Sequence, residues 1–258
     1  MLTLGADVEL IVRNKQGVPV SAIPYINGDK HYPESVPKGA IQHDGVLAEF
    51  NIDPANNKKE FIDNTVAVME YLGEHLARHD LSWDVVPSAH YGKDQLIDPI
   101  ANQSGCDPDM NAWSRKINPA PKLGDTTLRT CGGHIHFGIP DHLNSFEHIR
   151  RMVLACDVLL GLPSLVLDKG GAERKKLFGR ASCFRIKPYG FEYRTLSNFW
   201  VKNPNLIGWV HSQAEKVLAS MDSQDHYSGH IETMRKLIDS GDHVNAVQYI
   251  THFKVDMP

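Results

Sequence analysis

The residues best suited to chemistry lie on four short segments in which charged and apolar side chains alternate. Each segment carries two polar residues two positions apart: Asp7 and Glu9, Glu49 and Asn51, His134 and His136, and Glu192 and Arg194. Because residues two apart on a strand point to the same face, each segment has a polar face and an apolar face. If the four strands belong to one sheet, these ionisable groups converge on one surface.

Carboxylates that converge repel one another unless a cation lies between them. The acids Asp7, Glu9, Glu49 and Glu192, together with His134 or His136, are therefore the candidate metal ligands. Oxygen ligands with one imidazole suit Mg²⁺ or Mn²⁺ better than a structural zinc ion. The four segments together predict a carboxylate-rich metal site.

The histidine segment has the sequence Gly132-Gly133-His134-Ile135-His136. Paired glycines fit a place where the backbone approaches a ligand closely. A His-x-His pair also suits zinc, so a zinc-dependent hydrolase is one alternative. A non-catalytic binding module that keeps only the sheet is another. The alternation by itself is also typical of a half-solvated sheet with its charges facing water. We expect one histidine, in the first place His134, to contact the metal or a phosphate, and the other to orient substrate or hydrogen-bond.

A basic segment runs from Asp168 to Lys187, with seven Lys or Arg residues against two acids. Guanidinium groups suit phosphate oxygens, so Arg174, Arg180 and Arg185 are candidates to meet a phosphorylated substrate. A solvated basic loop is the alternative interpretation. The chain has neither a Gly-x-x-x-x-Gly-Lys-Ser/Thr loop nor a Gly-x-Gly-x-x-Gly turn before a helix. A nucleotide would therefore bind through metals and arginines.

Strands and helices must position these groups. Alternating patterns predict strands over 4–13, 18–23, 41–52, 83–87 and 130–139, and a strand or hairpin over 184–196. Helical spacing predicts helices over 60–78, 144–160, 203–218, 229–238 and 243–251. Asn56 or Asn57, Asn144, and Asn203 followed by Pro204 are the expected helix starts. Residues 90–125 have little periodicity and are expected to form a long functional insertion. The predicted fold class is α+β, with a mostly antiparallel sheet and helices packed on its apolar face.

The bulk composition limits the class of protein. A chain of about this length can fold around one hydrophobic core, and no linker divides it. We therefore expect a single domain over 1–258, with a core of about 4–202 and a helical C-terminal extension over 203–258. A net charge of −4 gives no sign of a nucleic-acid partner. No apolar run approaches the roughly 20 residues of a membrane helix. With no signal-peptide pattern and no Cys-x-x-Cys pair, we expect a cytoplasmic location and reduced cysteines.

Four motifs follow one another along the chain: Gly5-Ala-Asp-Val-Glu9, Asp44-Gly-Val-Leu-Ala-Glu49-Phe-Asn, the Gly-Gly-His-Ile-His segment and Tyr189-Gly-Phe-Glu-Tyr-Arg194-Thr-Leu-Ser-Asn-Phe-Trp200. Their content and order resemble the glutamine-synthetase-like carboxylate–amine ligases, and most of all the phage-type COOH·NH2 ligases (amidoligases, type 2). The segment 105–113 also looks typical of that group. The resemblance covers about residues 4–202.

The resemblance implies a sheet curved around an ATP site that holds two or more Mg²⁺ ions. The matching positions are the acidic pair Asp7 and Glu9, the metal carboxylate Glu49, a histidine from the pair His134 and His136 at metal or nucleotide phosphate, and Glu192 and Arg194 at a metal and the transferring phosphate. In the best-known relatives the first pair is Glu-x-Glu. The aspartate here is therefore expected to reach the metal through water.

The implied reaction joins a carboxylate to an amine through an acyl phosphate, with Arg194 and Arg180 or Arg185 meeting the negative charge that develops. The expected partners are small-molecule or peptide carboxylates and amines, with no nucleic acid and no membrane. The chain is much shorter than glutamine synthetase, so a site shared between subunits is in doubt and the oligomeric state stays open. Asp107, Asp109, Asn111 and Trp113 in the insertion are expected to help select the substrates.

Overall fold

The computed structural model describes residues 2–102, 109–119, 127–175, 177–222 and 229–258. Within these residues ten strands form one sheet in the order β2-β3-β4-β1-β10-β12-β11-β7-β8, with β5 paired to β1, and every pairing is antiparallel. The strands are β1 (Thr3–Arg13), β2 (Glu34–Val36), β3 (Gly39–Asp44), β4 (Leu47–Ile52), β5 (Ser82–Asp84), β7 (Met110–Asn111), β8 (Lys116–Ile117), β10 (Gly133–Gly138), β11 (Cys183–Lys187) and β12 (Gly190–Tyr193). A small second sheet pairs β6 (Ser88–His90) with β9 (Leu128–Thr130).

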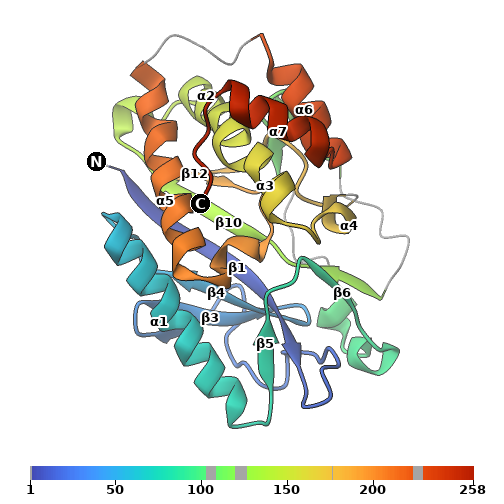
Figure 1. Ribbon diagram of the computed structural model, residues 1–258. Helices are drawn as coiled ribbons and strands as arrows, with labels where there is room; N and C mark the ends of the chain where they lie inside the picture. The colour runs from blue at the N-terminus through green and yellow to red at the C-terminus, as the bar shows by residue number, and fades with distance from the viewer. Residues whose placement is uncertain (1, 103–108, 120–126, 176, 223–228) are drawn as a thin grey trace.

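Helices cover one face of the main sheet. They are α1 (Lys58–Ala77), α2 (Phe146–Cys156), the π-helical segment η4 (Asp157–Gly161), α3 (Leu162–Leu167), α4 (Ala172–Lys175), α5 (Pro204–Ala219), α6 (Ile231–Ser240) and α7 (His243–His252), with short 3₁₀ turns η1 (Lys93–Leu96), η2 (Pro99–Asn102), η3 (Asp141–Leu143), η5 (Asn198–Lys202) and η6 (Ser220–Asp222). In Figure 1, α1 and α5 flank the strands on the left and the remaining long helices gather at the top. The predicted α+β class, a mostly antiparallel sheet with packed helices, is confirmed.

The apolar face of the sheet is the centre of the core. Val8, Phe50, Ile135 and Phe191 are fully buried there, and each alternates with a residue of the opposite, polar face. Helix α1 packs on β3 and β4, and α2 packs on β12. Burying these side chains stabilises the fold by roughly 1.5–3 kcal/mol each. The polar alternation that the sequence predicts is therefore the outer side of a sheet whose inner side is anchored by apolar packing.

The helix starts follow the predicted capping chemistry at two places. Asn57 caps α1 by accepting a hydrogen bond from the Glu60 N–H, and Asn203 caps α5 by accepting from the Leu206 N–H, with Pro204 in the first turn. The predicted start at Asn144 is wrong by one residue. Ser145 is the cap of α2, because its hydroxyl accepts from the His148 N–H.

Two predicted strands differ from the structure. The range 41–52 is a hairpin of β3 and β4, since the chain turns at Gly45-Val46, where Gly45 has φ +55°. That left-handed conformation costs a glycine little. The range 18–23 is no strand, because within the described part of the chain it forms a single isolated bridge, between Arg13 and Pro19.

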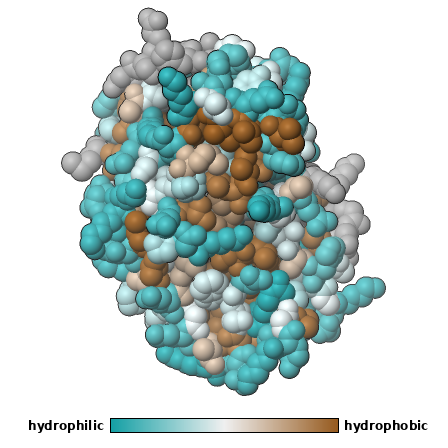
Figure 2. Space-filling model, viewed as in Figure 1, coloured by the Kyte–Doolittle hydropathy of each residue, from teal (hydrophilic) through white to brown (hydrophobic). Residues whose placement is uncertain are grey.

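The helical side of the molecule carries an apolar surface. Figure 2 shows apolar side chains gathered in its upper centre, over α3 and α7. Among the described residues of this region, Val244 and Val247 on α7 are exposed. The polar residues of the sheet lie on the face opposite the helices, so this apolar surface is separate from that polar face. No helix in the described ranges is long and apolar enough to span a membrane.

A buried carboxyl group under the sheet gives a test of the packing. Asp157 accepts hydrogen bonds from the Ser182 N–H (3.0 Å), the Ser182 hydroxyl (2.6 Å) and the Tyr193 hydroxyl (2.8 Å). Burial nevertheless raises the pKa of Asp157 to about 6. The folded state therefore binds this proton more tightly than the unfolded state, and stability is lost as the pH rises through about 4 to 6.

We expect Asp157→Asn to remove this pH dependence. The amide oxygen can keep two of the three hydrogen bonds, and the Ser182 hydroxyl can turn to accept the third. Between about pH 4.5 and about pH 7.5, the unfolding free energy of the wild type should fall by about 2 kcal/mol relative to the variant, as measured by urea denaturation. The exposed Asp63→Asn is the control. Equal slopes for the wild type and Asp157→Asn would contradict the buried, proton-binding state of Asp157.

Candidate active site

Strand register places the polar residues of the sheet in neighbouring rows. On β1 and β10, Asp7 lies opposite His134, although 127 residues separate them in the sequence. The remaining pairs across the sheet are Asp7 with Asn51, Glu9 with Glu49, Glu49 with Gln42, His136 with Glu192, and Glu192 with Arg185. The structure thus brings the four polar segments of the sequence together on one face.

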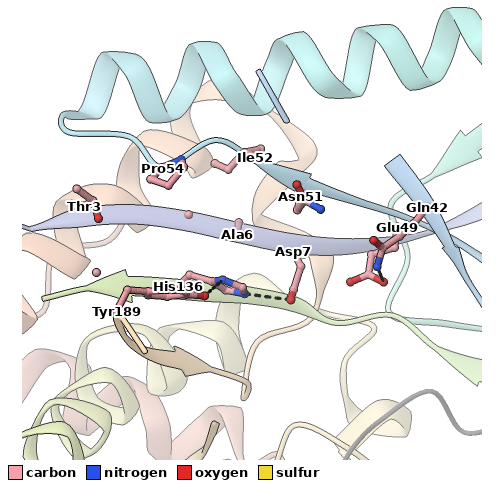
Figure 3. Close-up of a pocket in the computed structure, with 12 residues that line it drawn as sticks. Thr3, Ala6, Asp7, Gln42, Glu49, Asn51, Ile52, Pro54, His136 and Tyr189 are labelled. Carbon is pink, nitrogen blue, oxygen red and sulfur yellow. Dashed lines mark hydrogen bonds and ion pairs between the residues drawn. The ribbon is translucent and has the colours of Figure 1, made fainter. Parts of the chain in front are cut away.

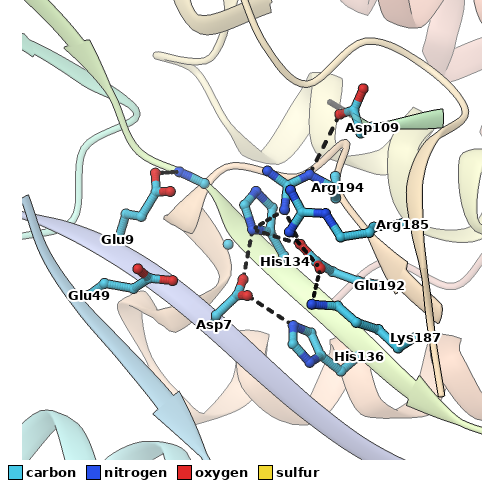
Figure 4. A network of polar contacts seen from close by, with 12 residues as sticks. Asp7, Glu9, Glu49, Asp109, His134, His136, Arg185, Lys187, Glu192 and Arg194 are labelled. Carbon is cyan, nitrogen blue, oxygen red and sulfur yellow. Dashed lines mark hydrogen bonds and ion pairs between the residues drawn. The ribbon is translucent and has the colours of Figure 1, made fainter. Parts of the chain in front are cut away.

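Asp7 holds both histidines (Figure 4). Its Oδ1 lies 2.7 Å from Nδ1 of His134 and its Oδ2 lies 3.0 Å from Nε2 of His136. The other ring nitrogen of His136 contacts the hydroxyl of Tyr189 at 2.7 Å. Burial alone would raise the pKa of Asp7, but the charges and hydrogen bonds of the two histidines outweigh it and hold that pKa well below its usual value. Asp7 is therefore an ionised acceptor that fixes the orientation of both imidazoles.

His134 is the more enclosed of the two histidines. Its side chain is almost fully buried, and burial followed by the charge of Arg194 lowers its pKa, which favours the neutral ring. A side chain on Gly132 would collide with its Nε2, and one on Gly133 would collide with Ser197 and Trp200. The paired glycines are therefore required by close packing inside the protein itself.

Glu192 is fully buried and is surrounded by cations. It contacts Arg194 directly, Arg185 at 3.2 Å and Lys187 at 3.0 Å. Burial and the charge of Asp7 raise the pKa of Glu192, but Arg194 and the two histidines outweigh them and hold it below its usual value. Glu192 is therefore a buried anion that gathers three basic side chains at one border of the acidic surface.

The negative charges of the acids on the other side of Asp7 are compensated less fully. Burial, followed by the neighbouring charge of Asp44, raises the pKa of Glu9 to about 7, although the Gly132 N–H donates to its Oε2 at 2.5 Å. Burial and then the charge of Asp7 raise the pKa of Glu49 well above its usual value, although Gln42 donates a hydrogen bond to it at 2.8 Å. Two acids with raised pKa values in facing positions are a place where a cation would replace the missing positive charge.

Two adjoining pockets open over these residues and share Asp7, Gln42 and Glu49. The first, of about 220 Å³, is lined by Gln42 and by the ionisable groups Asp7, Glu9, Lys30, Asp44, Glu49, His134, Arg185, Lys187 and Arg194. The second, of about 380 Å³, has His136 and Tyr189 on one wall and Asn51, Ile52 and Pro54 on another (Figure 3). The face of the sheet therefore offers a charged compartment beside a less charged one.

Two predicted arginines do not line these pockets. Arg174 is almost fully buried on α4, where it donates to the carbonyl of Thr195 at 3.0 Å, and its charge lowers the pKa of Glu9. Arg180 is exposed, and its carbonyl accepts a hydrogen bond from Thr195. Their predicted roles at phosphate stay predictions. Lys176, Asp107 and the first part of the 105–113 segment lie outside the described residues.

Several pocket residues were missed by the sequence reasoning. Lys30, Gln42, Asp44 and Tyr189 line the pockets but were not proposed as site residues. Gly45-Val46 is a two-residue hairpin turn, and reading Gly45 as its first central residue would have placed Gln42 opposite Glu49. Lys30 and Tyr189 lie outside regular strands and carried no comparable signal.

The donor set fits a hard divalent cation. Within the described residues, Asp7, His136 and Glu192 offer three ligand atoms that lie within 4.8 Å of one another. His136 belongs to this group, and His134 does not. Glu9 and Glu49, with their raised pKa values, form a second set of carboxylates on the far side of Asp7. Carboxylates with one imidazole are the ligands expected for Mg²⁺ or Mn²⁺.

One solved structure shares this fold at low sequence identity, and two others match at lower TM-scores. A bifunctional glutathione synthetase from Pasteurella multocida matches with a TM-score of 0.50 and 12% identity, covering 98% of this chain and 47% of that one. This chain thus spans about half the length of that protein. Ligand-free GmaS matches with a TM-score of 0.46 and 13% identity, covering 98% of this chain and 67% of that one. A GmaS/ADP complex gives 0.45 and 13%, with 98% and 68% covered.

The sequence comparison gives the family. No curated protein sequence matches the chain. The family model described as "Phage phiEco32-like COOH.NH2 ligase-type 2" matches residues 126–255, half of the chain. The match contains the histidine strand, the basic segment and the Glu192-x-Arg194 motif, whereas Asp7, Glu9 and Glu49 precede it and join the site through strand register. The chain therefore belongs to the phage phiEco32-like COOH·NH2 ligase type 2 family of carboxylate–amine ligases.

Proposed function

We propose that this chain is an ATP- and Mg²⁺-dependent ligase that joins a carboxylate to an amine through an acyl phosphate. The observation that carries the proposal is the arrangement around Glu192. Three basic side chains, Arg185, Lys187 and Arg194, gather on this buried acid, and all three line a pocket that also holds Glu9, Glu49 and Asp7. A triphosphate needs cations on its oxygens, and both metal ligands and arginines meet here.

The proposed metal ligands fall into two sets. Asp7, His136 and Glu192 form one, and Glu9 and Glu49 form the other, with His134 held by Asp7 between them. A bound Mg²⁺ or Mn²⁺ would neutralise phosphate charge and lower the pKa values of Glu9 and Glu49. The chain's own contribution is to hold these ligands on neighbouring strands of one rigid sheet, so that little reorganisation accompanies the reaction.

The proposed chemistry has two steps. A carboxylate oxygen of the first substrate attacks the γ-phosphorus of ATP, and the bond from that phosphorus to the leaving ADP oxygen breaks. The amine of the second substrate then attacks the carbonyl carbon of the acyl phosphate, the C–O bond breaks, and phosphate leaves. In this proposal Arg194 and Arg185 stabilise charge on the transferring phosphoryl group, and the amine loses one proton as the amide forms.

The substrates are proposed only as classes. Small-molecule or peptide carboxylates and amines fit two adjoining pockets of about 220 Å³ and about 380 Å³. The net charge of −4 gives no support for a nucleic-acid partner. We also propose that the chain acts as one catalytic domain, because α5 packs on both α1 and α2 and so joins the C-terminal helices to the layer under the sheet.

The proposal predicts hydroxamate formation. Purified protein with Mg²⁺-ATP, hydroxylamine and a panel of carboxylates should release ADP and form a hydroxamate with at least one acid, because hydroxylamine traps an acyl phosphate. EDTA should abolish both products, and Mn²⁺ should restore them. A folded protein that forms no hydroxamate with any acid would remove most support for ligation. Zinc retained through purification without nucleotide binding would instead favour the hydrolase alternative.

A further inference from the structure

We propose that Asp109 is a positioning residue that sets the orientation of Arg194 for phosphoryl transfer. The inference rests on the proposed function and extends it to the insertion between β6 and β9. Oδ2 of Asp109 lies 3.5 Å from Nε of Arg194, and Figure 4 shows the two side chains pointing toward each other. Both are largely shielded from water, with exposed side-chain fractions of 19% and 6%.

Asp109 is itself held in place by a second residue of the same hairpin. The Asn118 N–H donates to the carbonyl of Asp109 at 2.9 Å, and the Asn118 side chain donates to Oδ1 of Asp109 at 2.8 Å. The same amide group lies 3.2 Å from Sγ of Cys183, on β11. With Oδ1 occupied by Asn118, the carboxylate presents Oδ2 to the arginine. The β7–β8 hairpin thus fixes a negative charge at one defined position.

Arg194 is therefore held from two sides. Its Nη1 contacts Glu192, and its Nε faces Asp109. A single acidic partner leaves a guanidinium group free to rotate about the contact, whereas two acids on different elements restrict its plane. Positioning matters here, because a group that stabilises developing charge works only when it already lies in place. The acid lies in the insertion, so this surface segment acts on the chemistry through an orienting contact.

An anchoring role for the hairpin is the competing explanation. The ion pair could hold β7 against β11 without any effect on catalysis. The chain offers a matched pair for comparison: Arg13 and Asp84 form a partly buried ion pair at 2.7 Å between β1 and β5. Asp84→Asn therefore removes the same charge from the same kind of contact, away from the pockets.

The test compares Asp109→Asn with Asp84→Asn in the full chain. We expect kcat for hydroxamate formation to fall about tenfold in Asp109→Asn, while the KM for Mg²⁺-ATP stays close to that of the wild type. The second measurement needs no turnover: the ratio of the Kd for Mg²⁺-ADP to the Kd for a nonhydrolysable Mg²⁺-ATP analogue. This ratio reports contact with the terminal phosphate and should move toward one in Asp109→Asn alone.

The outcomes separate the hypotheses. If Asp109→Asn matches Asp84→Asn in kcat and in the affinity ratio, the pair only anchors the hairpin and the proposal is overturned. If Asp109→Asn does not fold, two other variants decide between positioning and anchoring. They are Asn118→Ala, which keeps the charge of Asp109 but releases its Oδ1, and Asp109→Glu. A fall in their kcat supports positioning, and wild-type kcat values overturn the proposal. A wild-type protein that binds neither nucleotide refutes the proposed function, and this inference with it, before any variant is compared.

Discussion

Glu192→Gln is expected to lower the rate of ADP release by about 10²–10³-fold, the loss typical of removing one preorganised electrostatic group from an active site. The reason is the position of Glu192 beneath three cations. Arg185, Lys187 and Arg194 all contact this carboxylate, which also belongs to the group of three metal-ligand atoms. A neutral amide of the same shape can neither orient three positive groups nor ligate a cation as strongly. Steady-state ADP release measures the effect.

The control for this change is Glu147→Gln on α2. Glu147 also pairs with arginines, at 2.7 Å from Arg150 and 3.4 Å from Arg115, but it is half exposed and lies outside the pockets. This variant should keep the wild-type rate, because exposed ion pairs contribute little. Circular dichroism should show that both variants are folded. Wild-type turnover in folded Glu192→Gln would remove Glu192 from the site.

Glu49→Gln should have opposite effects on stability and on activity. Burial and the charges of Asp7, Asp44 and Glu9 raise the pKa of Glu49. An acid with a raised pKa in the folded state favours folding at low pH, and that contribution is lost as the pH rises above the ordinary value near 4.5. Without metal at about pH 8, the variant should therefore unfold at a higher temperature than the wild type. Its ligase rate should fall together with its response to Mg²⁺.

The measurement is a thermal unfolding series with and without Mg²⁺ or Mn²⁺. The wild type should gain stability from the ion, because a ligand that binds only the folded state shifts the unfolding equilibrium. Glu49→Gln should gain much less. Glu215→Gln, on an exposed position of α5, is the control for the loss of a glutamate charge. An equal Mg²⁺-induced shift in wild type and Glu49→Gln would contradict a metal site between Glu9 and Glu49.

The sequence allowed the faces of the strands to be predicted, because alternation is a local property. Asp7 and Glu9 on β1, and His134 and His136 on β10, point to the polar face as their spacing requires. The α+β class followed from the same patterns. The capping of α1 by Asn57 was also predictable, since a cap depends only on residues within one helical turn.

Register and distant packing could not be predicted. Nothing local says that Asp7 lies opposite His134 or that both histidines share it as an acceptor. The burial of Arg174 depends on the carbonyl of Thr195, which another part of the chain supplies. The pairing of Arg194 with Asp109 joins the residue after β12 to an insertion without periodicity. Each of these contacts is tertiary, so a single sequence carries no signal for it.

The central claim is that a carboxylate takes the γ-phosphoryl group of ATP. It is tested most directly by labelling both carboxylate oxygens of an acid that gives a hydroxamate with ¹⁸O and following the label during ligation with Mg²⁺-ATP. Phosphate formation through an acyl phosphate transfers one labelled oxygen to each phosphate released, and mass spectrometry of the phosphate should find it there. Unlabelled phosphate, with both labelled oxygens retained in the acid, would contradict the account.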